Sequence, residues 1–349
     1  MIEGKEIVVN EPLVSIVMST KDTEEQLLKQ AIKSILNQSY KNFEFIIVCD
    51  GGKNDLHIIK EFKDNRIIIL KHEASVGLTK SLNEMLKIAK GKYIARMDSD
   101  DISTKDRLKI QVDFLEKNKN IEVCSTFYKK IGKINRYMVT SSIKFEGIKS
   151  QMLFLNPIAH STVMIRKEFL EKNSLLYDEE YVYSQDFELW TRSIQLGKFE
   201  IIPKLGLYYR IHDKQIGVAK KEKQNMLCNK ILKANLERLQ LSTKYMNVLQ
   251  FLNGNVEDVT VEDLDKFIED IRVNKIILEK YDSNVLVNSI INQWNIMSIK
   301  KKRIYMIRHI RFSLIFEFIY RIIYTIKLFT EDMYYTILGN VNIDSNIKE

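Results

Sequence analysis

The chain has 349 residues, too many for one small domain, and this length predicts two units or one large unit with an appendage. Its residues are 45% hydrophobic and 29% charged, as in ordinary globular proteins, and only three prolines and twelve glycines exclude a fibrous or wholly disordered chain. The formal net charge of +8 indicates an anionic partner, such as a nucleotide, a nucleic acid or a membrane surface.

The cysteines, histidines and apolar runs predict a reduced protein without membrane-spanning segments. Cys49, Cys124 and Cys228 are far apart and form no CxxC pair, so we expect reduced and mostly buried thiols in a cytosolic protein. The five histidines are also scattered, which gives no zinc motif. Residues 1–12 lack the apolar core of a signal peptide, and no uncharged apolar run approaches the roughly 18 residues of a transmembrane helix.

Short apolar runs alternate with helical stripes over the first hundred residues. The runs predict strands at residues 13–18, 43–49, 66–70 and 93–97. The stripes predict helices between these strands, at residues 24–36, 55–62 and 79–89. This β-α-β-α-β-α-β pattern is typical of a mostly parallel sheet that is covered on both faces.

Three carboxylates, Asp98, Asp100 and Asp101, directly follow the fourth predicted strand. They suit a hard divalent cation, which in turn pairs well with a diphosphate; the alternative is a turn whose acids only cap the next helix. Ser19 and Asp50 end two other predicted strands, at the sheet edge where parallel sheets bind ligands, and this convergence favours a site. No GxGxxG or GxxxxGK[ST] motif indicates a Rossmann dinucleotide site or a P-loop.

The rest of the chain predicts further strands and many helices. The segment from Ser103 to Asp106 has the form of a capping box that opens a helix through about residue 117. Strands are predicted at residues 121–128 and 137–141, and helices at residues 146–154, 183–196, 220–241, 261–278 and 285–294. The helices beyond residue 216 carry no catalytic motif, so we expect them to serve in packing.

A basic stretch at residues 300–329 differs from the other helical segments. It contains eight Lys and Arg residues against the single acid Glu317, a net charge of +7, with a broad apolar face and interleaved aromatic residues. A basic amphipathic helix of this composition suits the surface of an anionic bilayer. The alternative is a helix that packs on the rest of the chain or on a partner.

Several segments together resemble a known enzyme family. They are PLVSIVMST (12–20), FEFIIVCDGG (43–52), GLTKSLNEMLKIAKGKYIARMDSDD (77–101) and YSQDFELW (183–190). Over about residues 12–213 the chain resembles family 2 glycosyltransferases, which are inverting enzymes with the GT-A fold. It looks closest to the branch that makes bacterial capsule, exopolysaccharide and lipopolysaccharide chains.

The resemblance implies a metal-assisted donor site. Asp98-Ser99-Asp100 matches the family's DxD motif, which implies that Asp100, with help from Asp98, binds Mn²⁺ or Mg²⁺ and that Asp98 contacts the ribose or donor sugar. The other implied donor-binding residues are Ser19, Asp50, Asn83, Arg210 and His212. Cys49 stands where the family often has an acid that holds uracil, so the resemblance does not imply a strict preference for UDP.

The resemblance also implies a catalytic base and an acceptor side. Asp186 matches the family's general base, which would take the proton of the acceptor hydroxyl opposite the leaving group. At a helix N-terminus we expect Asp186 to stay ionised. Gln185, in place of the family's Glu, is expected on the acceptor side together with His160 and Trp190. The alternatives are an N-cap carboxylate at Asp186 and an ordinary core histidine at His160.

We therefore expect an α/β protein with the GT-A fold, a mixed and mostly parallel sheet between helices, and a helical C-terminal extension. Residues 1–215 would form the catalytic domain, with a nucleotide-binding half at 12–101 and an acceptor-binding half at 102–215, and residues 216–349 the extension. The expected activity moves a hexosyl or N-acetylhexosaminyl group from a nucleotide-sugar, most simply a UDP-sugar, to a growing glycan on a lipid carrier.

The expected location is cytoplasmic, on the inner membrane face through the basic segment, with no nucleic acid as partner. Two other functions fit the sequence less well. One is a non-catalytic membrane-associated scaffold, which the changes at Cys49 and Gln185 permit. The other is a sugar nucleotidyltransferase, which would need a glycine-rich basic loop after the first strand, where residues 19–22 read Ser-Thr-Lys-Asp.

Overall fold

The computed structural model describes residues 11–140, 142–212, 220–255 and 259–300, together with 323, 326 and 327. The predicted boundary at residues 215/216 and nearly all of the basic segment 300–329 lie outside these residues. Among the described helices, none is both long enough and apolar enough to cross a membrane.

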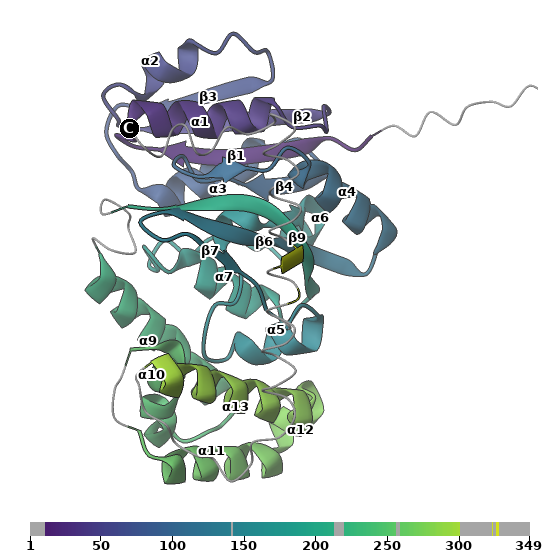
Figure 1. The fold of residues 1–349 in the computed structure, drawn as a ribbon, viewed down its shortest axis with the longest axis vertical. Coiled ribbons are helices and arrows are strands. Elements are labelled where there is room, and N and C mark those ends of the chain that lie inside the picture. Colours follow the sequence, from purple (N-terminus) through teal and green to yellow (C-terminus); the bar gives the residue numbers. More distant parts are fainter. Residues whose placement is uncertain are drawn as a thin grey trace, which may run out of the picture.

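One mixed sheet forms the centre of the molecule (Figure 1). Its strands are β1 (Val14–Thr20), β2 (Phe43–Asp50), β3 (Ile67–His72), β4 (Tyr93–Arg96), β5 (Ile102–Ser103), β6 (Ile121–Gly132), β7 (Arg136–Met138), β8 (Met164–Arg166) and β9 (Lys198–Ile211). They are ordered β3-β2-β1-β4-β8-β6-β9-β5, with β7 paired to the C-terminal half of β6. The first four strands in this order run parallel, and β8 is antiparallel to both of its neighbours. The predicted mixed, mostly parallel sheet is confirmed.

Helices cover both faces of the sheet, as predicted. One face packs against α1 (Glu25–Leu36), α2 (Asp55–Lys60) and α4 (Arg107–Lys117). The other packs against α3 (Leu78–Ile88), α5 (Phe145–Gln151), α6 (Lys167–Lys172) and α7 (Gln185–Ser193), with the short 3₁₀ helix η1 (His160–Thr162) beside β4. All eight residues of β2 are buried, because both of its faces are covered.

The structure corrects two local predictions. Helix α4 begins at Arg107 without a side-chain cap, so the predicted capping box does not form. Ser103 lies instead in β5, where it pairs with Leu207 of β9, and a residue in a strand cannot cap the helix. The single helix predicted at 261–278 is two helices, because Asn274 ends the first and caps the second by accepting a hydrogen bond from the amide of Ile277 at 3.0 Å.

The predicted helical extension is present and lies at the end of the molecule opposite β3 (Figure 1). It comprises α9 (Lys221–Arg238), η2 (Thr243–Tyr245), α10 (Met246–Asn253), α11 (Val261–Val273), α12 (Lys275–Lys280) and α13 (Ser283–Lys300). Its apolar side chains belong to the same core cluster as one face of the sheet: Trp190 and Phe199 of the sheet layer and Trp294 of α13 are all fully buried in it. The extension therefore packs as one unit with the sheet and its helices.

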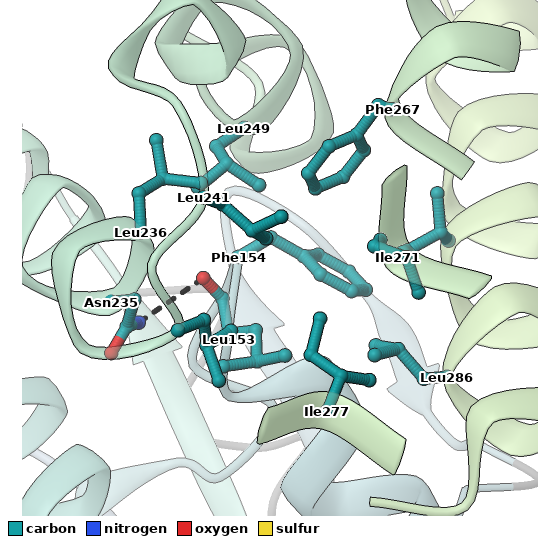
Figure 2. Close-up of a pocket in the computed structure, with 12 residues that line it drawn as sticks. Leu153, Phe154, Asn235, Leu236, Leu241, Leu249, Phe267, Ile271, Ile277 and Leu286 are labelled. Atoms are coloured by element: carbon teal, nitrogen blue, oxygen red, sulfur yellow. Dashed lines mark hydrogen bonds between the residues drawn. The ribbon is translucent and has the colours of Figure 1, made fainter. Parts of the chain in front are cut away.

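The turn after α5 joins the sheet layer to the extension (Figure 2). Leu153 and Phe154 point among the apolar side chains of the extension, and Asn235 of α9 donates a hydrogen bond to the Leu153 carbonyl at 3.1 Å. The gap left between these side chains is about 10 Å³, which is too small for anything larger than a single water. This region is a packing seam.

Candidate active site

A cleft of about 510 Å³ opens where β1, β2 and β4 end at their carboxyl termini. Helix α7, η1, the end of β9 and the start of α9 also contribute to its walls. Eight of the residues predicted for the site line it: Ser19, Asp50, Asp98, Asp100, His160, Gln185, Asp186 and His212. The convergence of strand-end side chains that the sequence predicted is thus present in the structure.

Asn83 and Trp190, also predicted for the site, do not line the cleft. Asn83 is buried in α3, where it donates to the Tyr177 carbonyl and accepts from the Tyr177 amide, both at 2.9 Å. Its side chain therefore fixes the segment that leads to α7. Trp190 is 1% exposed, and its ring lies edge-on to those of His160 and Phe199 with centroids 6.0 Å apart in each case. It supports the cleft from behind.

Asp98 is held by a buried cation beneath the cleft. Arg96, in β4, is 2% exposed and donates from Nη2 to Oδ1 of Asp98 at 2.5 Å. Its Nε and Nη1 have no hydrogen-bond partner in the described part of the chain. Arg107 of α4 donates to the Arg96 carbonyl at 2.8 Å and so fixes the end of the strand. The buried guanidinium of Arg96 thereby offsets the charge of Asp98 and holds its carboxylate in place.

Asp100 is tied to the segment that ends β9. The Nε2 atom of His212 lies 2.9 Å from Oδ2 of Asp100, and Arg210 donates from Nε to the Asp100 carbonyl at 2.9 Å. Arg210 also donates to Gln30 of α1 at 2.6 Å, and it does not line the cleft. Burial and the charge of Asp98 raise the pKa of Asp100, and the hydrogen bond with His212 offsets part of this effect.

The third carboxylate of the cluster has a structural task. Asp101 is fully buried and does not line the cleft. Its carboxylate accepts hydrogen bonds from Ser161 Oγ at 2.7 Å and from the Arg210 amide at 2.8 Å. Burial and the neighbouring carboxylates raise its pKa well above the usual range. Asp101 therefore joins η1 and β9 below the other two acids.

The carboxylate of Asp50, at the end of β2, is hydrogen-bonded by residues of a loop and by a histidine. Its carboxylate accepts from the amides of Val76 and Gly77 at 2.7 and 2.9 Å and from Ser75 Oγ at 2.8 Å. His72 bridges Asp50 Oδ1, at 2.9 Å, and Glu84, at 2.6 Å. Burial alone would raise the pKa of Asp50, but these hydrogen bonds outweigh it and leave that pKa below its usual value.

Asp186, in the first turn of α7, has only neutral hydrogen-bond partners in the described structure. Asn156 donates from Nδ2 to its Oδ2 at 2.9 Å. Burial raises the pKa of Asp186 to about 6, against hydrogen bonds from the Phe187 amide and its own amide that favour the anion. A carboxylate with this pKa is ionised at neutral pH and basic enough to accept a proton.

Two polar side chains flank Asp186 in the cleft. His160 hydrogen-bonds the Tyr177 hydroxyl through Nε2 at 2.8 Å, and burial together with the charge of Arg96 lowers its pKa well below the usual value, so it is neutral. Gln185 is 5% exposed, and its Oε1 atom has no hydrogen-bond partner among the described residues. Both groups therefore present polar atoms without charge.

Sequence reasoning missed three residues that hold the predicted ones. Arg96 had a detectable signal, because it is the one charged residue in an otherwise apolar buried strand. His72 had none, since it meets Asp50 only through the fold. Asn156 stands four residues before the predicted His160 in the sequence, but its hydrogen bond to Asp186 also arises only through the fold.

The lining of the cleft is strongly acidic. The described residues that line it include six carboxylates, at positions 22, 24, 50, 98, 100 and 186, and Lys21 is the single Lys or Arg among them. No three His, Cys, Asp or Glu side chains in the described part are grouped as a complete metal site. A phosphate-bearing ligand in this cleft would need a cation to offset the acids.

Comparison with known proteins identifies the family. Residues 15–174 match the family model described as Glycosyl transferase family 2. An uncharacterized glycosyltransferase of Methanocaldococcus jannaschii is 37% identical over 234 residues, which span 65% of this chain and 80% of that protein. The UDP-Glc:alpha-D-GlcNAc-diphosphoundecaprenol beta-1,3-glucosyltransferase WfaP of Escherichia coli is 31% identical over 64% of this chain and 86% of its own length.

Solved structures agree on the fold. The crystal structure of S. aureus TarS 1–349 in complex with UDP-GlcNAc aligns with a TM-score of 0.55 at 17% sequence identity, over 84% of this chain and 93% of that one. This likeness confirms the GT-A fold predicted from the sequence. The family match and the sequence relatives show that the chain belongs to glycosyltransferase family 2 and is a glycosyltransferase.

Proposed function

We propose that this glycosyltransferase moves a sugar from a UDP-sugar to a hydroxyl group of a lipid-linked surface glycan, with inversion at the sugar carbon. The observation that carries the proposal is that Asp98, Asp100 and Asp186 line one cleft, with carboxylates from the strand ends on one side and a carboxylate of pKa about 6 on the other. The names of WfaP, a glucosyltransferase with a diphosphoundecaprenol-linked acceptor, and of the TarS complex with UDP-GlcNAc support the substrate classes.

A divalent cation fits the donor side. Mg²⁺ and Mn²⁺ are commonly held by one or two carboxylates together with substrate phosphates, and the acidic lining offers such carboxylates to an anionic diphosphate. Asp100 and Asp98 would hold the ion, with His212 beside them. When bound, the cation would offset the charge that develops on the departing UDP.

The remaining donor-side residues would orient the nucleotide. Ser19 and Asp50, which line the cleft at the ends of β1 and β2, would contact the nucleotide base. Arg210 would act by fixing the backbone of Asp100, since its guanidinium is bound to that carbonyl and to Gln30. Asn83 would act through the Tyr177 segment.

Asp186 would act as the general base. Its carboxylate takes the proton of the acceptor hydroxyl while the hydroxyl oxygen attacks the sugar carbon from the face opposite UDP, which inverts that carbon. Asn156 orients the carboxylate through its hydrogen bond at 2.9 Å. The unpaired Oε1 of Gln185 would accept a hydrogen bond from the acceptor sugar, with His160 at the same wall and Trp190 behind it.

The test is a donor screen. UDP release from a panel of nucleotide-sugars is measured with Mn²⁺, with and without a synthetic GlcNAc-diphospho-lipid, for the wild type, Asp100→Ala, Asp186→Asn and the exposed control Asp113→Asn. We expect turnover of a UDP-sugar, a fall of about 10²–10⁴-fold for Asp186→Asn, and wild-type rates for the control. No turnover of any donor by the wild type, or wild-type rates in both cleft variants, would contradict the proposal and favour a scaffold.

Membrane attachment is a separate part of the proposal. The basic segment 300–329 would bind the anionic inner face of the cell membrane, where lipid-linked acceptors are reached. We expect the full chain to sediment with vesicles that contain phosphatidylglycerol, and a chain without residues 301–349 to stay in solution. Equal sedimentation of the two chains would defeat this part alone.

A further inference from the structure

Helix α9, the first helix of the extension, contacts the segment that leads into the helix of Asp186. Gln224, close to the start of α9, donates from Nε2 to the Tyr183 carbonyl at 2.8 Å. Ser184 donates from Oγ to the Gln224 carbonyl at 3.3 Å. Gln224 and Tyr183 both line the cleft. The extension therefore reaches the site itself, two residues before the proposed base.

Tyr183, the residue whose carbonyl accepts the hydrogen bond from Gln224, has an unfavourable backbone conformation. Tyr183 has a φ of +79°, in the left-handed region that bulky side chains rarely adopt. Such a conformation persists only where surrounding contacts hold it, and it collects at functional sites. The hydrogen bond from Gln224 to the carbonyl of this same residue is a contact of that kind. Without it, Tyr183 is free to relax and to turn the chain that follows.

The start of α7 shows what this conformation achieves. Ser184 is the N-cap residue of α7, yet its hydroxyl makes no capping bond and is turned toward α9 instead. An N-cap hydroxyl would ordinarily accept from the amide of the second or third residue of the helix. Here no side chain caps the helix, and the Phe187 amide, at the third position, instead favours the anion of Asp186. The turn of Ser184 toward α9 leaves this amide to the base.

Further contacts hold the two segments together at the surface. Lys230 of α9 pairs with Glu180 at 3.1 Å and lies over the Tyr181 ring at 4.6 Å. Lys223 lies over the Tyr183 ring at 5.7 Å. Each such exposed contact adds little stability by itself, but all of them join α9 to the segment of residues 180–184.

From these contacts we propose that Gln224 is a positioning residue for Asp186, so that the extension takes part in sugar transfer by fixing the catalytic base. The proposal rests on the function proposed above, in which Asp186 is that base. Gln224 holds Tyr183 left-handed, this turns the Ser184 hydroxyl to α9, and the first turn of α7 then carries Asp186 to its hydrogen bond with Asn156. Asp186 keeps its place only while α9 is docked.

The test uses the full chain with Mn²⁺ and two changes at one position. Gln224→Glu keeps the size of the side chain but loses the N–H that binds the Tyr183 carbonyl, and Gln224→Ala removes the side chain. Lys233→Ala, an exposed change on the same helix, is the matched control. We measure kcat and KM for UDP release from the preferred donor, the Kd of UDP, the Tm, and amide hydrogen exchange in residues 183–187 by mass spectrometry.

We expect kcat to fall by about 10–100-fold in both Gln224 variants, because small displacements of a catalytic group are costly. Donor KM and the Kd of UDP should stay within about twofold, since a positioning role leaves the donor side intact. Exchange in residues 183–187 should become faster, and the control should match the wild type. Wild-type kcat or unchanged exchange in the Gln224 variants would overturn the proposal, as would a joint loss of UDP affinity and Tm.

Failure of the proposed function gives a different pattern. If Asp186→Asn keeps wild-type kcat, Asp186 is not the base, and both the proposed function and this inference fall. If Asp186→Asn is inactive but the Gln224 variants are fully active, only the inference falls. If the wild type turns over no donor, the exchange measurement still shows whether Gln224 orders residues 183–187, and unchanged exchange overturns the positioning role.

Discussion

The two sides of the cleft both present carboxylates, but they surround them differently. On the donor side Asp98 is paired with Arg96 and Asp50 with His72, so a cationic or cation-forming group stands beside each acid. On the base side Asp186 has the neutral Asn156 and backbone amides, and its pKa rises to about 6. In the proposed function one residue type thus serves two tasks: acids with cationic or cation-forming partners hold the metal ion, and Asp186, with neutral hydrogen-bond partners among the described residues, accepts the proton.

The largest effect should come from breaking the donor side. Asp100→Ala should lower kcat/KM for the UDP-sugar by about 100-fold or more in Mn²⁺, because the ion that offsets the leaving charge loses a ligand. Titration calorimetry with UDP, with and without Mn²⁺, would show the loss in binding. Asp186→Asn is the matched variant on the other side and should bind UDP as the wild type does. Equal losses of UDP binding in both variants would abolish the distinction between the two sides.

The base side should reveal itself in the pH dependence. Asp186 works as an anion, so kcat of the wild type should fall as pH drops through about 6. Asn156→Ala removes a hydrogen bond to the anion and should raise the pH at which kcat falls, the acid limb of the pH profile, by about one pH unit. Rates measured from pH 5 to 9 would show this shift, with Asn173→Ala, at the residue that follows α6, as a control. A limb that stays in place would mean that Asn156 does not support the anion.

The carboxylate of Asp186 should lower the free energy of unfolding at neutral and alkaline pH. Its pKa is higher folded than unfolded, so wild-type stability is lost as pH rises from about 4 through 6. Asp186→Asn removes this loss and should raise the free energy of unfolding at pH 8 by an amount whose upper limit is about 3 kcal/mol, which solvent in the cleft reduces. Denaturant unfolding at pH 8 and pH 4 should show a gain only at pH 8. A variant less stable than the wild type at pH 8 would show that burial does not destabilise the ionised form of Asp186.

The smallest effect concerns the donor-side histidine. Burial alone would lower the pKa of His72, but its bonds with Asp50 and Glu84 raise it overall. Its contribution to stability should therefore be complete below the unfolded pKa of about 6.5 and be lost as pH rises through the raised value. His72→Gln should cost about 1 kcal/mol at pH 6 and less at pH 9, whereas the exposed His57→Gln should cost little at either pH. A pH-independent cost would show that the pairing of His72 is not ionic.

The donor side was also the more predictable of the two. Asp98 and Asp100 follow an apolar strand, and the rule that ligands bind at the carboxyl ends of parallel strands placed them beside Ser19 and Asp50. The contact of Asn156 with Asp186 depends on packing that no local pattern encodes. For Asp186 the resemblance supplied the role, but its raised pKa comes from burial that only the fold creates.

Local chemistry was ambiguous elsewhere for physical reasons. Asn274 can continue a helical stripe or cap a new helix, and the tertiary packing selects the second. Ser103 fits a capping box by spacing, yet pairing with β9 makes it part of a strand. Gln224 lies in a helix without any motif, and its contact with Tyr183 arises only because α9 folds back on α7.

The core that the extension shares with the sheet has a consequence for how the enzyme matures during synthesis. A nascent chain emerging from the ribosome has exposed every carboxylate of the cleft well before Trp294, which lies in α13, the last helix in the described range 259–300. Domains fold as units during synthesis, N-terminal parts first, so the donor side can form early. Leu153, Phe154 and the apolar face of α7 can be buried only later, when the helices of the extension that pack on them have been synthesised. The face of α7 that packs in this core is therefore completed only after α13 has been synthesised, so we expect Asp186 to reach its final position after the donor side has formed.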